Sequence, residues 1–339
     1  MDKKLFSRYK KPLVPLPDLL EIQKNSFNWV VEKGIGELFK EFSPIRDYTG
    51  KKFDLEFTGF ELDKPKHPEQ YSKLNNLSFE APLRVKVNLI NKTLKESKEQ
   101  EIFLADFPLM TPHGTFIING VERVIVPQLA RSFGVFFTVN ELKAKKFFGA
   151  KIIPVRGVWI ELESEADGSV FARIDRKRKF SVNHLLSVIG EFSKEKPLDV
   201  FKRLAIEPAA DIKAFFTEGK GAEKNNDESH VEIYRKVRDS DLATASNARE
   251  FVASILGEEK YDLSRVGRFH FNKRFGKGMT EADLAKRMLS LEDLVLILGN
   301  IATLNATPGA TEDDIDHLGL RRVRAVGEML QLKLRMGLA

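Results

Sequence analysis

Hydrophobic and polar positions follow different periods along this chain, and the periods divide it into three regions. Residues 17–42 carry apolar side chains near helical spacing, so we expect helices there, divided into two pieces at Gly34 and Gly36. Residues 52–126 carry short apolar stretches between turn residues, which is typical of an antiparallel sheet. From about residue 183 onward, apolar residues recur every three or four positions, which again predicts helices.

The C-terminal region is expected to contain several helices and one exposed loop. The helices are expected at 181–192, at 197–205, within 228–256, and from about Arg321 to the end of the chain. The stretch 218–229 is charged, contains glycine and has no periodicity, so it predicts a loop. The last helix runs to Ala339 without a C-cap, and we interpret the chain as cut there.

Two hairpins can be placed at the level of single residues. Asn119-Gly120 separates the apolar stretches 115–118 and 121–126, and it suits a type I′ turn because both central residues need a positive φ. The second hairpin spans 157–175, where apolar and polar residues alternate around Asp167-Gly168. We expect a three-residue loop with Gly168 in the left-handed conformation.

The three-residue register decides which side chains of this hairpin share a face. It sets Ile160 opposite Ile174 on the buried face and Trp159 opposite Asp175 on the other, whereas a two-residue turn would mix the faces. Trp159 would then be ordinary interface core, with Asp175 paired to a neighbouring basic residue. Alternatively, Trp159 offers a flat surface for an unstacked base, and Asp175 accepts a hydrogen bond from a base or holds an arginine.

Composition and charge narrow the function classes. A chain of 339 residues with 42% hydrophobic and 31% charged residues is typical of an ordered, soluble protein of two domains. The net charge of +6 favours polyanionic partners, and basic residues gather in 1–12 and 173–179, although such runs are as typical of a solvated face. The chain lacks cysteine, long apolar runs and a secretion signal, so we expect a cytoplasmic protein without membrane contact.

No catalytic centre is visible in the sequence. The six histidines are scattered, and no glycine-rich stretch ends in Gly-Lys-Ser or Gly-Lys-Thr. The acidic cluster 312–316 has the density to bind magnesium. However, arginines at 321, 322 and 324 follow it, so we favour a structural or nucleic-acid-contact role over metal binding.

Five motifs, in a fixed order, carry a resemblance to a known family. They are Pro108-Leu109-Met110-Thr111 with Thr115 to Val126 and Gly134-Val135-Phe136-Phe137; Arg156-Gly157 with Trp159; Phe171 with Arg173-Ile174-Asp175-Arg176; Tyr261-Asp262-Leu263-Ser264 with Val266-Gly267-Arg268; and Asp314-Ile315-Asp316-His317-Leu318-Gly319 with Arg321-Arg322-Val323-Arg324. Over essentially the whole chain, they resemble the N-terminal segment of the bacterial RNA polymerase β-subunit family.

The resemblance implies an α+β fold of two domains. A mixed helix and antiparallel-sheet protrusion domain would comprise 1–132 and 313–339, and a largely helical lobe domain carrying a β-hairpin would comprise 133–312. It also implies a part of a nucleotidyltransferase that has no catalytic residue or cofactor of its own and is inactive alone, because the catalytic magnesium is held by the partner subunit β′. The implied partners are DNA, the RNA–DNA hybrid, the subunits β′, α and ω, and σ factor.

The resemblance also implies site residues. A pocket for the non-template DNA strand falls on Arg131, Trp159, Asp175, Ile315, Asp316 and Arg321. In that picture Trp159 stacks on an unpaired base and Asp316 reads an extruded guanine. Part of a rifamycin-contacting wall falls on Arg123, Val126 and Gln128, and a contact for the transcription-repair coupling factor falls on Lys98 and Glu99.

Two other function classes remain open. A stand-alone interaction module would bind a transcription factor without touching nucleic acid, and salt dependence of DNA binding separates it from the first hypothesis. An independent nuclease or transferase has no supporting constellation of catalytic side chains.

Overall fold

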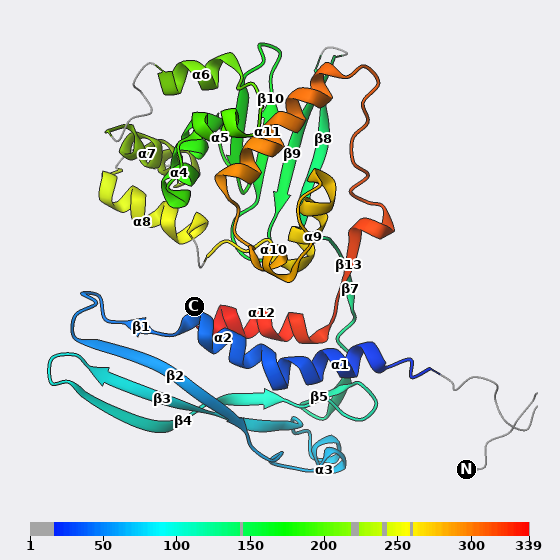
Figure 1. The fold of residues 1–339 in the computed structure, drawn as a ribbon. Helices are drawn as coiled ribbons and strands as arrows, with labels where there is room; N and C mark the ends of the chain where they lie inside the picture. Colours follow the sequence, from blue (N-terminus) through cyan, green and yellow to red (C-terminus); the bar gives the residue numbers. More distant parts are fainter. Residues whose placement is uncertain (1–16, 143–144, 218–223, 239–242, 258–259, 339) are drawn as a thin grey trace, which may run out of the picture. The chain divides into compact units, whose positions relative to one another are not determined.

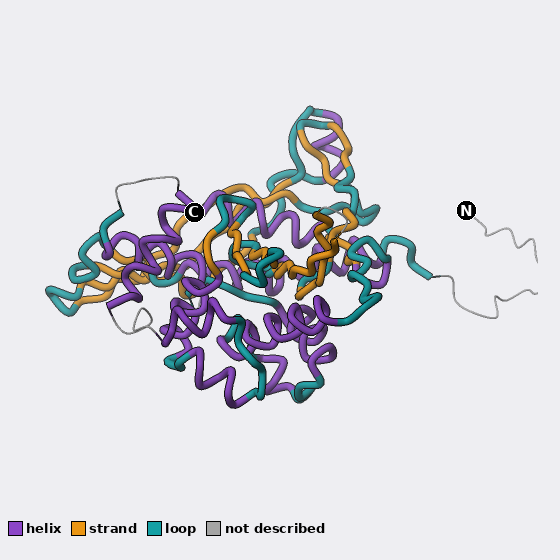
Figure 2. The backbone as a smooth tube through the Cα atoms, turned by 90° about the horizontal axis from the view of Figure 1, so that it is seen from above, coloured by secondary structure: helices purple, strands orange, loops and turns teal. Residues whose placement is uncertain are grey.

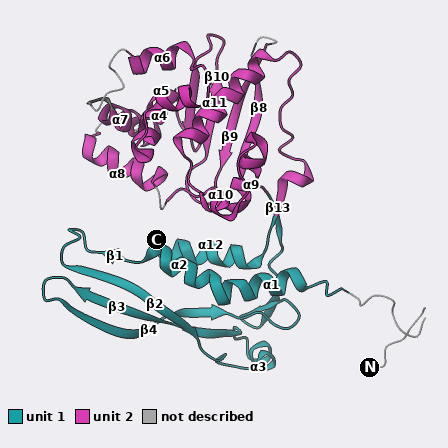
Figure 3. Cartoon of the chain, in the orientation of Figure 1, with its two compact units in different colours: residues 1–130, 323–339 teal, residues 131–322 magenta. Residues whose placement is uncertain are grey.

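The computed structural model describes residues 17–338 except 143–144, 218–223, 239–242 and 258–259. The chain forms two compact units (Figure 3): unit 1 comprises 1–130 and 323–339, and unit 2 comprises 131–322. Unit 2 is thus inserted into unit 1 in sequence, and residues 313–322 pack with unit 2. The expected boundaries of the protrusion and lobe domains stay predictions.

Unit 1 combines helices with an antiparallel four-stranded sheet (Figure 1). Its helices are α1 (Glu21–Trp29), the π-helical turn η1 (Val30–Gly34), α2 (Ile35–Phe42), α3 (Glu69–Leu74) and α12 (Val326–Leu338). Its sheet has the order β1-β2-β3-β4, formed by β1 (Ile45–Arg46), β2 (Phe53–Leu62), β3 (Glu80–Asn91) and β4 (Glu96–Pro108). A small hairpin joins β5 (Phe116–Ile118) to β6 (Val121–Arg123), and its turn has the positive φ values that we expected, 51° at Asn119 and 78° at Gly120.

The first helical region is continuous, so the expected break at Gly34 and Gly36 is wrong. Gly34 keeps a helical φ of −62°, and η1 carries the chain directly from α1 into α2. A Cβ at Gly34 would lie 3.0 Å from a methyl group of Val30, so this glycine allows close packing inside the π-helical turn. Its carbonyl accepts a hydrogen bond of 2.9 Å from Nε2 of Gln331 in α12. The glycine therefore serves helix–helix contact.

Unit 2 contains a five-stranded antiparallel sheet of order β12-β11-β10-β9-β8. The strands are β8 (Gly134–Leu142), β9 (Lys145–Ile153), β10 (Ile160–Ser164), β11 (Val170–Ile174) and β12 (Phe180–Ser181). Its helices are α4 (Val182–Ser193), α5 (Pro197–Arg203), α6 (Ala210–Thr217), α7 (Lys224–Arg238), α8 (Ala245–Leu256), α9 (Ser264–Phe275), α10 (Glu281–Ala285), α11 (Leu291–Ala306) and the 3-10 turn η2 (Leu318–Leu320). The α+β class is confirmed, but the expected hairpin is the middle of a larger sheet.

The predicted register of the 157–175 hairpin is confirmed. Ile160 pairs with Ile174 and Glu161 with Arg173, as the three-residue loop requires. Gly168 has a φ of +86°, and its N–H donates to the carbonyl of Glu165 at 3.1 Å.

The two faces of this sheet differ in chemistry. Helices cover one face (Figures 1 and 2), where Phe137, Ile152 and Leu162 are almost completely buried in the core of unit 2. The opposite face carries cross-strand charges, and Glu161 lies between Lys151 at 3.4 Å and its register partner Arg173. The alternation of the strands therefore separates the apolar core from a face that carries charged side chains, of which Glu161 is itself buried.

Two further element predictions need correction. Helix α7 begins at Lys224, inside the stretch expected to be a loop, while 218–223 lies outside the described residues. Residues Arg321–Arg324 form strand β13, and the last helix begins only at Val326. Val326 is fully buried in the unit 1 core, whereas Val323 in the strand is 53% exposed.

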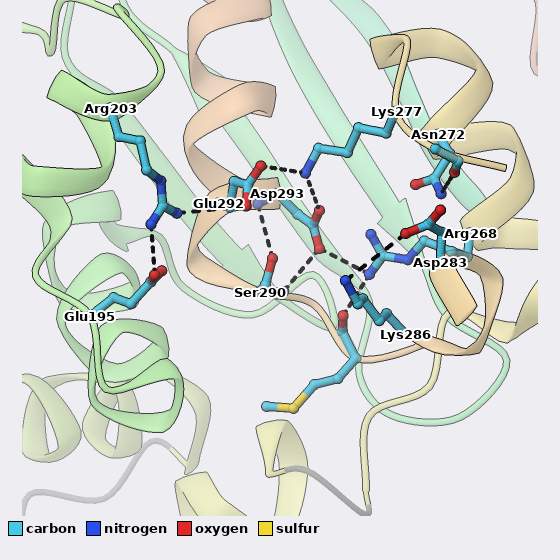
Figure 4. A network of polar contacts seen from close by, with 12 residues as sticks. Glu195, Arg203, Arg268, Asn272, Lys277, Asp283, Lys286, Ser290, Glu292 and Asp293 are labelled. Atoms are coloured by element: carbon cyan, nitrogen blue, oxygen red, sulfur yellow. Dashed lines mark hydrogen bonds and ion pairs between the residues drawn. The ribbon is translucent and has the colours of Figure 1, made fainter. Parts of the chain in front are cut away.

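A polar network with an almost buried ion pair ties α9 to α11 (Figure 4). Nη2 of Arg268 donates to Asp293 at 2.9 Å and to the carbonyl of Met288 at 2.6 Å. Asp293 also belongs to a capping box with Ser290, which begins α11, and its other oxygen lies 3.4 Å from Nζ of Lys277. The two helices are thus joined by charge-assisted hydrogen bonds between nearly buried side chains.

Candidate nucleic-acid interface

The first group of site residues is an exposed carboxylate beside two arginines. Nη2 of Arg321 donates to Oδ1 of Asp316 at 2.7 Å, and Nη2 of Arg131 lies 4.0 Å from the same oxygen. The side chain of Asp316 is 65% exposed, and a carboxylate has more acceptor sites than the bond to Arg321 uses. The structure therefore brings together three of the six predicted nucleic-acid-binding residues.

Paired strands place the two arginines next to each other. Strand β7 (Gln128–Arg131) pairs with β13 (Arg321–Arg324) in a two-stranded sheet, and the N–H of Ser132 donates to the carbonyl of Leu320 at 3.0 Å. Arg131 ends β7 and Arg321 begins β13. Ile315, the fourth predicted residue, is partly buried directly before Asp316.

The first two acids of the cluster 312–316 bind backbone groups of strand β8. Asp313 accepts a hydrogen bond of 2.7 Å from the N–H of Phe137 in β8, and Glu312 accepts one of 3.2 Å from Val139. Among the residues that the structure describes, no group of three or more His, Asp or Glu side chains is arranged to hold a metal ion. These acids instead fasten the segment that carries Asp316 to strand β8.

The second group is the corner where Trp159 meets Asp175. The N–H of Trp159 donates to Oδ1 of Asp175 at 2.9 Å, and the N–H of Asp175 donates to the carbonyl of Trp159 at 2.9 Å. Trp159 is partly exposed and Asp175 is exposed, so neither is sealed in the core. The predicted neighbourhood of the indole and the carboxylate is present.

A tight turn places a third residue, Arg176, on the indole. The turn runs from Ile174 to Lys177, and its central residues Asp175 and Arg176 have φ values of +48° and +61°. Non-glycine residues rarely adopt this conformation, so it carries strain. The guanidinium carbon of Arg176 lies 5.9 Å from the centre of the Trp159 ring, within the range of a cation–π contact.

Sequence reasoning missed this role of Arg176, which it had counted only within a basic run. The positive φ values at Asp175 and Arg176 are not encoded by glycine or asparagine, so the turn left no signal in the sequence.

Tyr261 supports the loop that carries Trp159. A Cβ at Gly157 would lie 2.7 Å from Cδ2 of Tyr261, and Gly157 has a φ of +107°, so only glycine fits over this ring. Burial raises the pKa of Tyr261 far above its ordinary value, and the negative charge of Asp175 raises it further. The next residue, Asp262, donates from its N–H to the carbonyl of Arg156 at 2.9 Å. The loop that carries Trp159 is therefore packed on the ring of Tyr261 and hydrogen-bonded to the backbone of Asp262.

Helix α9 lies next to both groups. Tyr261 and Asp262 come just before it, and a Cβ at its Gly267 would lie 3.3 Å from Phe133, two residues after Arg131. Arg322, which follows Arg321, has its guanidinium carbon 4.1 Å from the centre of the Phe133 ring. Both groups belong to unit 2, but no single contact described above joins Trp159 to Asp316.

The remaining predicted residues lie in unit 1, and their roles stay predictions. Arg123 ends β6, Val126 follows it in an irregular segment, Gln128 begins β7, and all three are exposed. Lys98 and Glu99 are exposed on β4, which is an edge strand of its sheet. Within the described ranges, every helix is too short or too polar to cross a lipid bilayer.

Comparison with known proteins agrees with this architecture. The family model of RNA polymerase Rpb2, domain 2, matches residues 131–324, which correspond closely to unit 2. The DNA-directed RNA polymerase subunit beta of Syntrophomonas wolfei is 40% identical over 335 residues, covering 98% of this chain and 29% of that protein. The subunit of the same name from Synechocystis sp. is 42% identical over 327 residues, covering 95% of this chain and 28% of that protein.

The similarity to these relatives runs through both units, since it covers nearly the whole chain, although the chain spans less than a third of their length. The ordered motifs, the inserted unit 2 and these matches lead to one conclusion: the chain belongs to the bacterial RNA polymerase β-subunit family, and residues 131–324 form its Rpb2 domain 2.

Proposed function

We propose that this chain is a part of DNA-directed RNA polymerase that positions DNA, above all the non-template strand of the transcription bubble and the downstream duplex. The observation that carries the proposal is the exposed carboxylate of Asp316 between Arg321 and Arg131. An unpaired guanine presents an N1–H and an amino group side by side on its Watson–Crick edge. A carboxylate that is fixed in place accepts both, and the adjacent arginines attract the phosphate backbone.

The Trp159 corner would hold a neighbouring base. Its indole is partly exposed, and stacking of a base on an aromatic ring is worth about 1–3 kcal/mol. Asp175 accepts the N–H of Trp159 and thereby fixes the end of the strand that presents the ring. We propose that the two groups act on adjacent parts of one strand, one by stacking and the other by base recognition.

The chemistry of nucleotide transfer would lie elsewhere in the enzyme. We propose that the catalytic magnesium is held by β′, and that this chain contributes positioning within an assembly with β′, α, ω and σ in the cytoplasm. The acids of this chain fit that division, because Glu312 and Asp313 accept backbone hydrogen bonds and Asp316 binds Arg321. The partial rifamycin wall and the coupling-factor contact remain proposals of the same kind.

Replacing Trp159 with alanine in the assembled polymerase tests the stacking role. Loss of base stacking should shorten the lifetime of complexes with a bubble template by about 3- to 30-fold. The effect is smaller than the full stacking energy because the substitution also frees Arg176 from its cation–π contact with the indole. Trp29→Phe, in unit 1, is the control for changing a tryptophan. An unchanged lifetime would instead support a module that binds a protein partner without touching DNA.

A further inference from the structure

Strand β8 is an edge strand whose unpaired N–H groups are satisfied by side chains from a distant segment. It ends the five-stranded sheet, so its outer backbone groups have no strand partner within that sheet. Oδ2 of Asp313 accepts the N–H of Phe137 at 2.7 Å, and the N–H of Asp313 donates to the carbonyl of Phe137 at 2.9 Å. Oε2 of Glu312 accepts the N–H of Val139 at 3.2 Å. Two carboxylates thus cap the edge and fasten their own segment to it.

Arg274, in the last turn of α9, holds the same carboxylate from the other side. Its Nη1 donates to Oδ1 of Asp313 at 2.8 Å and to Oδ2 at 2.6 Å. Its guanidinium carbon lies 4.3 Å from the centre of the Phe137 ring, so the arginine is packed as well as hydrogen-bonded. The side chain of Asp313 is only 20% exposed, which reduces screening by solvent. Arg274, Asp313 and Phe137 together form what we call the β8 clamp.

The clamp lies close in sequence to the carboxylate proposed to read guanine. Only two residues separate Asp313 from Asp316, and the N–H of Asp316 donates to Oδ1 of Asp314 at 3.0 Å inside that short connection. On its other side Asp316 is held by Arg321. The position of the carboxylate is thus set between the clamp and Arg321, and a shift of about 1 Å is enough to weaken a directional contact to a base.

We propose that Arg274 is a positioning residue for base recognition: acting through Asp313, it sets where the Asp316 carboxylate meets the extruded base. This inference rests on the proposed function. Arg274 itself does not touch the nucleic acid in this picture. A lysine at this position would retain the charge but would not reproduce the planar fork and its packing on Phe137.

The test uses the assembled polymerase with variants of this chain and templates that differ only in the proposed non-template base. The lifetimes of open complexes with guanine and with adenine give a preference ratio. We expect Arg274→Gln to lower this ratio by roughly threefold or more, Arg274→Lys to be intermediate, and Asp316→Ala to abolish it. The control is Arg265→Gln, which removes an exposed arginine of the same helix bound to Glu281 at 2.6 Å and should leave the ratio unchanged.

Hydrogen exchange at the N–H of Phe137 supplies a second, structural readout, since Arg274→Gln should speed it while Arg265→Gln should not. Faster exchange together with a lowered ratio supports the inference. If Asp316→Ala lowers the ratio but Arg274→Gln leaves it intact, the positioning role is refuted and the proposed function stands. If Asp316→Ala also has no effect on the ratio, both fail.

Discussion

The buried pair of Arg268 and Asp293 allows a stability prediction that can be worked out from the contacts. The side chains are 5% and 2% exposed, and the pair joins α9 to the first turn of α11 (Figure 4). Replacing Arg268 with methionine keeps the length of the apolar stem but removes the charge. Asp293 would then retain only the N–H of Ser290 at 3.0 Å and Lys277 at 3.4 Å.

Removing one partner of a buried ion pair costs about 3–5 kcal/mol, because the other charge stays buried. Lys277 is 25% exposed and compensates in part, so we expect Arg268→Met to lower the free energy of unfolding of unit 2 by about 3 kcal/mol. That corresponds to a fall in melting temperature of roughly 6–12 °C for a unit of this size. Adding Asp293→Asn removes the stranded charge yet keeps an acceptor for Ser290, so the double variant should recover much of the loss.

The assay is urea unfolding followed by tryptophan fluorescence. In a Trp29→Phe background, Trp159 is the remaining tryptophan and reports on unit 2 alone. Arg265→Gln, which removes an exposed ion pair, should change the stability by less than about 1 kcal/mol. A loss below about 1 kcal/mol for Arg268→Met, or a double variant less stable than the single one, would refute the reasoning.

Three further predictions concern pH and the Trp159 loop. Burial by itself raises the pKa of Asp293, because it opposes ionisation, but the charge of Arg268 and the hydrogen bonds outweigh it, so the pKa lies below 3.8. The stabilisation by this pair should therefore be present above about pH 4 and be lost as the solution is acidified further. Burial lowers the pKa of His184 below 6.5, so the neutral imidazole should stabilise the fold fully above about pH 6.5, and this stabilisation should be lost at lower pH. Between about pH 7.5 and 5.5, the free energy of unfolding in urea should therefore fall less for His184→Gln than for the parent chain. Equal losses in the two chains would contradict this. Gly157→Ala should strain the loop over Tyr261 by about 1–3 kcal/mol and speed hydrogen exchange at the N–H of Trp159, whereas unchanged exchange would show that the loop does not depend on this glycine.

The features that local rules determine were predicted correctly from the sequence. The register of the 157–175 hairpin follows from loop length and from the alternation of Ile160 and Leu162 with polar residues, so it needed no knowledge of distant residues. The Asn119-Gly120 turn follows in the same way from two residues that tolerate a positive φ. The conformation of each of these two elements is therefore determined by a few neighbouring residues.

The features that depend on distant partners were missed or wrong. Gly34 has the composition of a helix breaker, but its role is contact with Gln331, almost 300 positions away. Strand β8 contains the nearly unbroken apolar run from Val135 to Val139, and its edge is capped by acids that lie more than 170 positions further on. The acidic cluster resembled a possible metal site because the sequence does not show which backbone groups these acids accept.

Recognition of an unpaired guanine of the non-template strand by the Asp316 carboxylate is the step on which the proposed function depends most. The most direct measurement compares open-complex lifetimes of the assembled polymerase on four templates that differ at this one base, for the parent chain and for Asp316→Ala. We expect the parent to hold the guanine template about 5- to 100-fold longer and the variant to treat all four templates alike. An equal loss of lifetime on all four templates, with the guanine preference intact, would show that Asp316 is only a structural partner of Arg321.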